Sequence, residues 1–137
     1  MLELKDKVAI VTGGGGGIGG AITLRFAREG AKIVIAEIDA KAAQSRIEEI
    51  TANGGEAVFD FTDVTNKASV QQMVRETASR WGRIDILVNV AGGSRIKEVI
   101  DIEDAEWDQV VNLNLKSVFY VPKRSCRRCS RKNMEKS

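Results

Sequence analysis

Short apolar runs alternate with longer amphipathic segments along the first 121 residues of the chain. The apolar runs are rich in β-branched residues, which favour buried strands, and there are four of them: residues 7–12, 32–37, 57–61 and 84–90. Apolar positions recur at helical spacing in four further segments: residues 18–29, 40–51, 66–81 and 104–120. The pattern therefore predicts strands and helices in regular alternation.

Turn-forming residues mark the ends of these segments. Gly30, Gly54 and Gly82 follow the first three helical segments, where a glycine commonly ends a helix. Asp101 and Asp104 are the candidate N-caps of the fourth, because a short acidic side chain can bond the free amides of a first helical turn.

Alternating strands and helices predict right-handed βαβ crossovers and a parallel sheet with helices on both faces. The predicted fold class is therefore α/β, a Rossmann-like doubly wound sheet. About four strands are predicted, which is few for this class, so we expect the sheet to be incomplete.

Composition narrows the chemistry that the chain can perform. The 137 residues include no histidine, which excludes Ser-His-Asp and Cys-His catalysis and histidine-ligated zinc. Two cysteines alone cannot complete a zinc shell, so no metal site is expected. The first ten residues contain no long apolar run, so we expect a cytoplasmic protein with no membrane partner.

A glycine-rich loop links the first predicted strand to the first predicted helix. Residues 12–19 read Thr-Gly-Gly-Gly-Gly-Gly-Ile-Gly. Glycines in this position allow a sharp turn and let a pyrophosphate approach the backbone and the helix N-terminus. A Walker A loop is excluded because no Gly-Lys-Ser/Thr follows, and a glycine turn without a ligand is the alternative.

Glu37 ends the second predicted strand, 24 residues after Gly13. A carboxylate there can accept hydrogen bonds from the ribose hydroxyls of an adenosine, whereas it would repel a 2′-phosphate. Neither residues 14–16 nor Ile38 supplies a basic side chain to neutralise that phosphate. We therefore expect NAD to be preferred over NADP.

The glycine loop resembles the cofactor loop of the short-chain dehydrogenase/reductase family. Three further motifs add to the resemblance: Asp63-Val64, which resembles the adenine-contacting pair; Asn89-Val90-Ala91-Gly92, which resembles the Asn-Asn-Ala-Gly segment; and Asn114, which matches the catalytic asparagine. The resemblance implies that the cofactor is bound by Thr12, Gly13, Gly17, Ile18, Gly19, Glu37, Asp63, Val64, Asn89, Ala91 and Gly92. It covers residues 4 to about 120.

The family resemblance also implies hydride transfer between nicotinamide and a small carbonyl or alcohol substrate. The family's remaining catalytic groups are a serine and a Tyr-x-x-x-Lys pair, and this chain lacks that pair. Tyr120 is its one tyrosine and is followed four residues later by Arg124. We therefore expect Tyr120 to be a packing residue and the chain itself to be inactive.

The last residues differ in composition from the rest. Residues 1–121 carry 14 basic and 18 acidic side chains, whereas residues 122–137 carry 7 basic and 1 acidic. Pro122 stands at the join and predicts an interruption of the preceding helix, because proline lacks a backbone N–H. The basic residues show no aromatic interleaving, so no specific nucleic-acid partner is expected.

Reverse translation of residues 122–137, read in another frame, gives an apolar helix that ends in glycine and resembles the family's next segment. We therefore expect an NAD-binding half-domain over residues 1–121 and an out-of-frame tail over 122–137, with the chain truncated by a frameshift. The alternative function is a noncatalytic dinucleotide-binding or interaction module. The fourth strand is expected to leave an open sheet edge, which favours homo-oligomers or aggregation.

Overall fold

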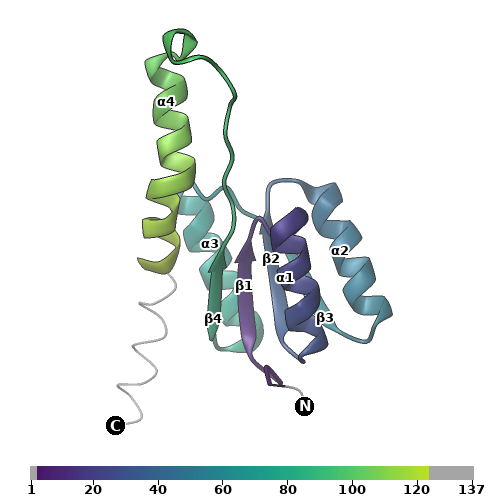
Figure 1. The fold of residues 1–137 in the computed structure, drawn as a ribbon. Helices are drawn as coiled ribbons and strands as arrows, with labels where there is room; N and C mark the ends of the chain where they lie inside the picture. The colour runs from purple at the N-terminus through teal and green to yellow at the C-terminus, as the bar shows by residue number, and fades with distance from the viewer. Residues whose placement is uncertain (1–2, 124–137) are drawn as a thin grey trace.

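The computed structural model describes residues 3–123. Four parallel strands form one sheet in the order β3-β2-β1-β4 (Figure 1). Their bounds are β1 (Val8–Thr12), β2 (Lys32–Glu37), β3 (Glu56–Phe61) and β4 (Ile86–Asn89). The predicted fold class is confirmed: the chain forms a Rossmann-like α/β sheet.

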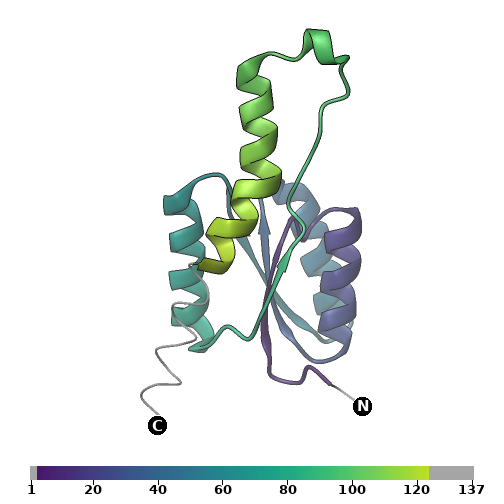
Figure 2. The ribbon, with the colours of Figure 1, turned by 60° about the vertical axis from the view of Figure 1, so that its left-hand side comes forward.

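Helices cover both faces of this sheet. They are α1 (Gly17–Arg28), α2 (Ala40–Ala52), α3 (Lys67–Trp81) and α4 (Asp104–Val111), with a 3₁₀ turn at Val99–Asp101. α1 and α2 lie on one face, and α3 lies on the other beside the end of the helical segment that begins with α4 (Figures 1 and 2). Each crossover helix returns the chain to the end of the sheet at which the previous strand began, so that all four strands run parallel.

The central strand β2 explains why both faces are covered. In β2, Ile33 and Ile35 pack with residues of α1 and α2, whereas Val34 and Ala36 pack with residues of α3. Side chains alternate between the faces of a strand, so a run that is apolar at every position can be buried only between two layers.

Helix ends follow the predicted signals in α3 and differ in α4. Asn66 caps α3 through hydrogen bonds to two amides of its first turn, and Gly82 ends α3 with φ of 71°. The N-cap predicted at Asp101 or Asp104 is wrong, since Glu103 takes that position. The Glu106 carboxylate accepts the Glu103 N–H at 3.4 Å, while Asp104 already belongs to the first turn.

The helix predicted from residue 104 forms, but the apolar positions of α4 are not buried. Residues 104–111 include no buried side chain, and this part of the helix rises beyond the carboxyl ends of the strands (Figure 2). Trp107 and Phe119, two of the apolar positions at helical spacing, are 63% and 59% exposed. Within residues 3–123 no other layer of structure covers these side chains, so the apolar face of this helix is left exposed there.

Beyond α4, a π-helical turn spans Asn112–Lys116, and helical conformation then continues through Pro122 to Lys123. The predicted interruption at Pro122 is therefore not observed. Val121, just before it, is fully buried against α3 and the sheet. The predicted tail lies outside the described residues from 124 onward.

Candidate cofactor site

The carboxyl ends of the four parallel strands meet at one edge of the sheet. β1 lies between β2 and β4, so the chain order reverses on the two sides of β1. Crevices at such reversal points are where doubly wound folds bind ligands. Every residue predicted to bind the cofactor lies on a strand end or loop at this edge or on the first turn of α1.

Thr12 joins β1 to the segment that follows β4. Its hydroxyl oxygen accepts hydrogen bonds from the amides of Val90 at 3.1 Å and Ala91 at 3.2 Å. The same hydroxyl donates to the Val88 carbonyl at 3.5 Å. Thr12 is itself buried, so its contribution to the site is to hold two strand ends together.

The glycine loop turns tightly between β1 and α1. Gly13 has φ of 64°, and a Cβ there would lie 2.9 Å from the Ala91 nitrogen. A Cβ on Gly19 would overlap the Gly13 carbonyl oxygen, so only glycine lets α1 begin this close to β1. A Cβ on Gly17 would meet nothing within 4 Å, and Ile18 is 74% exposed. The loop is therefore tightly packed at Gly13 and Gly19, whereas its outer rim, at Gly17 and Ile18, is open to solvent.

Glu37 ends β2, as predicted, and its carboxylate is turned toward backbone amides of the glycine loop and of the turn after β2. One carboxylate oxygen accepts the Gly15 N–H at 3.3 Å. The other accepts the Ile38 N–H at 3.0 Å and the Asp39 N–H at 3.3 Å. The sequence places an acid here, but the participation of Gly15 was not predicted, because any residue can donate a backbone N–H.

Asp63 and Val64 follow β3 and differ in accessibility. The Asp63 carboxylate accepts hydrogen bonds from the amide and hydroxyl of Thr65, at 2.9 and 2.6 Å. Val64 is only 4% exposed and belongs to the core under α3. The side chain of Val64 is therefore a packing group, and Asp63 is the more accessible member of the pair.

Asn89, Ala91 and Gly92 close β4. Asn89 is in register with Thr12, and both Asn89 and Gly92 are exposed at the carboxyl edge. A Cβ on Gly92 would lie 2.6 Å from the Asn114 side-chain oxygen. The structure thus brings Asn114, from the π-helical turn, directly onto the segment that follows β4.

Asn114 bonds the backbone on both sides of it. Its side-chain oxygen accepts the Gly93 N–H at 3.1 Å, and its amide nitrogen donates to the Gly93 carbonyl at 2.7 Å and the Val110 carbonyl at 2.9 Å. π-helical turns are frequent at functional sites because they reorient one side chain. Gly93 was missed by sequence reasoning, although it directly follows a predicted site residue.

Tyr120 does not join this site. Six residues separate it from Asn114, which places it about 240° further around an ideal helix. Lys116 and Lys67 lie against its ring, with ammonium nitrogens 5.5 and 5.1 Å from the ring centre. A hydrogen bond from Lys116 is the largest cause lowering the pKa of Tyr120.

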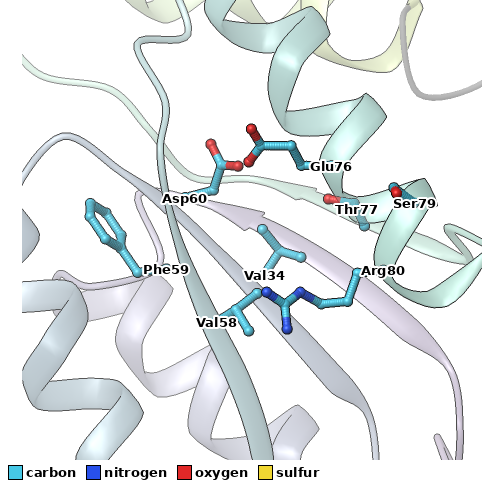
Figure 3. A pocket seen from close by; sticks show the side chains of 8 residues that line it. All are labelled: Val34, Val58, Phe59, Asp60, Glu76, Thr77, Ser79 and Arg80. Atoms are coloured by element: carbon cyan, nitrogen blue, oxygen red, sulfur yellow. The ribbon is translucent and has the colours of Figure 1, made fainter.

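A cavity of about 380 Å³ lies elsewhere, between β3 and α3 (Figure 3). Asp60 and Glu76 point toward one another at its rim. Burial is the main cause that raises the pKa of Asp60 to about 6, with the facing Glu76 adding to it and the Thr62 hydroxyl opposing it. None of the predicted cofactor residues lines this cavity.

Among residues 3–123, no group of three acidic or cysteine side chains could hold a metal ion. In the same part of the chain, no helix has the length and apolar character needed to cross a bilayer.

A parallel sheet with a glycine loop at its reversal point defines the Rossmann-like class of dinucleotide-binding folds. The sequence model of the short chain dehydrogenases matches residues 7–133. This chain belongs to the short-chain dehydrogenase/reductase family, whose members bind NAD or NADP.

Individual proteins are similar to this chain in sequence or in fold. The chain is 40% identical over 118 residues to the (2S)-[(R)-hydroxy(phenyl)methyl]succinyl-CoA dehydrogenase subunit BbsD of Thauera aromatica, covering 86% of this chain and 48% of that protein. A 7α-hydroxysteroid dehydrogenase complexed with NADH and 7-oxo glycochenodeoxycholic acid matches with TM-score 0.87 and 35% identity, over 93% of this chain and 49% of that one.

An actinorhodin polyketide ketoreductase with NADPH matches with TM-score 0.85 and 30% identity, over 90% of this chain and 47% of that one. The chain spans about half the length of the curated relatives it matches. Similar folds are thus bound to either dinucleotide, so the choice between the two depends on local chemistry.

Proposed function

We propose that this chain is the NAD-binding part of an oxidoreductase that acts on a small carbonyl or alcohol substrate. The observation that carries the proposal is the glycine loop at the reversal point, closed at Gly19 against Gly13 and open beside Gly17. This shape leaves backbone and the N-terminus of α1 accessible to a pyrophosphate.

The residues present fit a dinucleotide. Gly17 and Ile18 form an open rim at the start of α1, and Glu37 holds its carboxylate at the end of β2, where an adenosine ribose would lie. Asp63 and Asn89 lie at the ends of the flanking strands. A bound nicotinamide supplies hydride transfer, and the residues of this chain bind and orient it.

NAD is the proposed cofactor because of the charge on Glu37. A 2′-phosphate placed near this carboxylate would be repelled, and residues 14–16 and Ile38 provide no basic side chain to offset the repulsion. NADP should therefore bind more weakly than NAD.

Asn114 is the one proposed catalytic residue in this chain, and we propose that the chain alone does not turn over substrate. General acid–base transfer to a carbonyl oxygen needs a side chain that can exchange a proton at that atom. Asn114 cannot do so, and its amide is already bonded to Gly93 and Val110. Tyr120 lies on another side of the helix.

A noncatalytic binding or interaction module is the second candidate function. It is favoured by the exposed apolar side chains of the helix that contains Trp107 and Phe119. Binding without turnover fits both candidates. Oxidation of an alcohol by the purified chain would favour the oxidoreductase over the binding module, and it would refute the proposed inactivity of the chain alone.

Titration calorimetry of the full chain with NAD and NADP tests the cofactor assignment. We expect saturable binding of NAD and weaker binding of NADP. Equal or tighter binding of NADP would refute the proposed preference.

A further inference from the structure

Tyr120 lies beside two lysines that come from different helices. Lys67 is the first residue of α3, and Lys116 lies one turn before Tyr120 in its own helical segment. Their ammonium nitrogens are 5.1 and 5.5 Å from the centre of the phenol ring. The packing of α3 beside this segment therefore brings two positive charges to one phenol (Figures 1 and 2).

Neither lysine is paired with an acid in the described part of the chain. Among residues 3–123, no carboxylate lies within ion-pair distance of either ammonium group. Both ammonium groups instead donate hydrogen bonds to the phenol oxygen of Tyr120. The bond from Lys116 is the largest cause that lowers the pKa of this phenol; the charges of both lysines and the bond from Lys67 add to it, while desolvation opposes it.

The phenol is also accessible and lies next to an apolar surface. Tyr120 is partly exposed, and its neighbour Phe119 is 59% exposed, with the two ring centres 6.0 Å apart. None of the predicted cofactor residues takes part in these contacts. An accessible phenol that two ammonium groups favour as its phenolate is a nucleophile for which the proposed function has no use.

We propose that Tyr120 is a nucleophilic site that accepts acyl groups from activated esters. The phenolate oxygen attacks the ester carbonyl carbon, and the carbon–oxygen bond to the leaving group then breaks. The acyl group ends as an ester on Tyr120, the leaving group departs with the bonding electrons, and the phenol proton passes to solvent. Lys67 and Lys116 are positioning residues that favour the ionised phenol. This activity goes beyond the dinucleotide site and does not depend on it.

The probe is p-nitrophenyl acetate, because it releases the coloured p-nitrophenolate as it transfers its acetyl group. We expect the full chain to release a burst of about one equivalent of p-nitrophenolate per chain. Peptide mapping by mass spectrometry should place the acetyl group on Tyr120, the one tyrosine of the sequence. The burst should be lost in Tyr120→Phe, which keeps the aromatic ring and removes the nucleophile.

A double variant, Lys67→Gln with Lys116→Gln, tests the role of the two charges. It should slow acetylation of Tyr120 about threefold or more, because less of the phenol is ionised at neutral pH. Ultraviolet titration measures this ionisation directly, since one tyrosine gives the whole tyrosinate signal. The double variant should titrate at higher pH than the unaltered chain. Lys41→Gln, in α2 on the opposite face of the sheet, is the matched control and should change neither measurement.

Absence of a burst in the unaltered chain would overturn the proposal, as would a burst of equal size in Tyr120→Phe. Equal acetylation rates and equal tyrosine titrations in the unaltered chain and the double variant would overturn it as well. If a variant does not fold, as judged by circular dichroism, the acetylated residue of the unaltered chain decides, and acetyl groups on lysines with Tyr120 unmodified refute the site. NAD titration is a separate measurement, so these outcomes leave the proposed cofactor site untouched.

Discussion

The side chain of Asn114 bonds both the N–H and the carbonyl oxygen of Gly93, at 3.1 and 2.7 Å. The side-chain amide of Asn114 therefore satisfies both backbone hydrogen-bonding groups of Gly93, as the backbone of a neighbouring β-strand would. The π-helical turn at Asn112–Lys116 presents Asn114 to this segment. The helix is thereby tied to the chain that leaves β4.

Replacing Asn114 with alanine should destabilise the protein by about 1 to 2 kcal/mol, because several partly solvated hydrogen bonds are lost together. Hydrogen exchange should accelerate at Gly93 in particular. Denaturant unfolding and amide exchange measure the two effects. The matched control is Gln109→Ala, an exposed position on the same helix. Unchanged exchange at Gly93 would show that Asn114 does not hold this segment.

Gly19 and Gly17 should respond differently to alanine. A methyl group on Gly19 would overlap the Gly13 carbonyl, so we expect Gly19→Ala to cost about 3 kcal/mol. A methyl group on Gly17 would meet nothing within 4 Å, and Gly17→Ala should unfold like the unaltered chain. Thermal unfolding of both variants checks this, and equal losses would refute the proposed geometry of the loop.

The layers of the fold could be predicted from sequence because β2 is apolar at every position between its ends. Such a strand fits only between two helical layers, and the spacing of the next segments supplied them. The exposure of Trp107 could not be predicted in this way. Helical spacing of apolar residues identifies one face of a helix, but not whether another layer lies against it.

Part of the candidate site could be predicted from the sequence. The glycine run shows where the backbone can turn tightly, and Glu37 follows Gly13 by 24 residues, the spacing expected of a ribose-binding acid. The bonds from Gly15 to Glu37 and from Gly93 to Asn114 could not be predicted, because they use backbone groups that all residues share. Val64 was correctly located after β3, but its burial depends on how α3 packs.

Asp60 should make folding stability depend on pH. Burial raises its pKa from 3.8 to about 6, so the folded chain holds this proton more tightly than the unfolded chain does. The stabilisation is complete below pH 3.8 and is lost as the pH rises through about 6. Asp60→Asn should abolish this loss.

Since Asp60 is only partly buried and water screens its charge, the expected gain of Asp60→Asn at neutral pH is discounted to about 1 kcal/mol. Denaturant unfolding at several pH values measures it. Asp108→Asn, at an exposed position of α4, is the control and should leave the pH profile unchanged. A parallel profile for Asp60→Asn and the unaltered chain would contradict the assignment.

The chain should associate in a concentration-dependent manner. Among the described residues, no strand pairs with the outer edge of β4. Trp107 and Phe119, which belong to one helical segment, are both more than half exposed. Replacing both side chains with glutamate should reduce association in light-scattering measurements without lowering the unfolding temperature.

The control for this experiment is Phe61→Glu, because Phe61 is 63% exposed at the opposite edge of the sheet. Its substitution should change association much less. A chain that remains monomeric at every concentration, or an equal response to all substitutions, would argue against this surface.

Titration of NAD into the full chain and into Gly17→Asp tests the central claim most directly. An aspartate at the first residue of α1 suits the helix dipole, so the variant should fold normally, yet its carboxylate would occupy the open rim and repel a pyrophosphate. We predict saturable NAD binding by the unaltered chain and its loss in the variant, with unfolding temperatures that agree. Equal NAD binding by the two proteins, or none by a folded unaltered chain, would contradict the assignment of the glycine loop as the cofactor site.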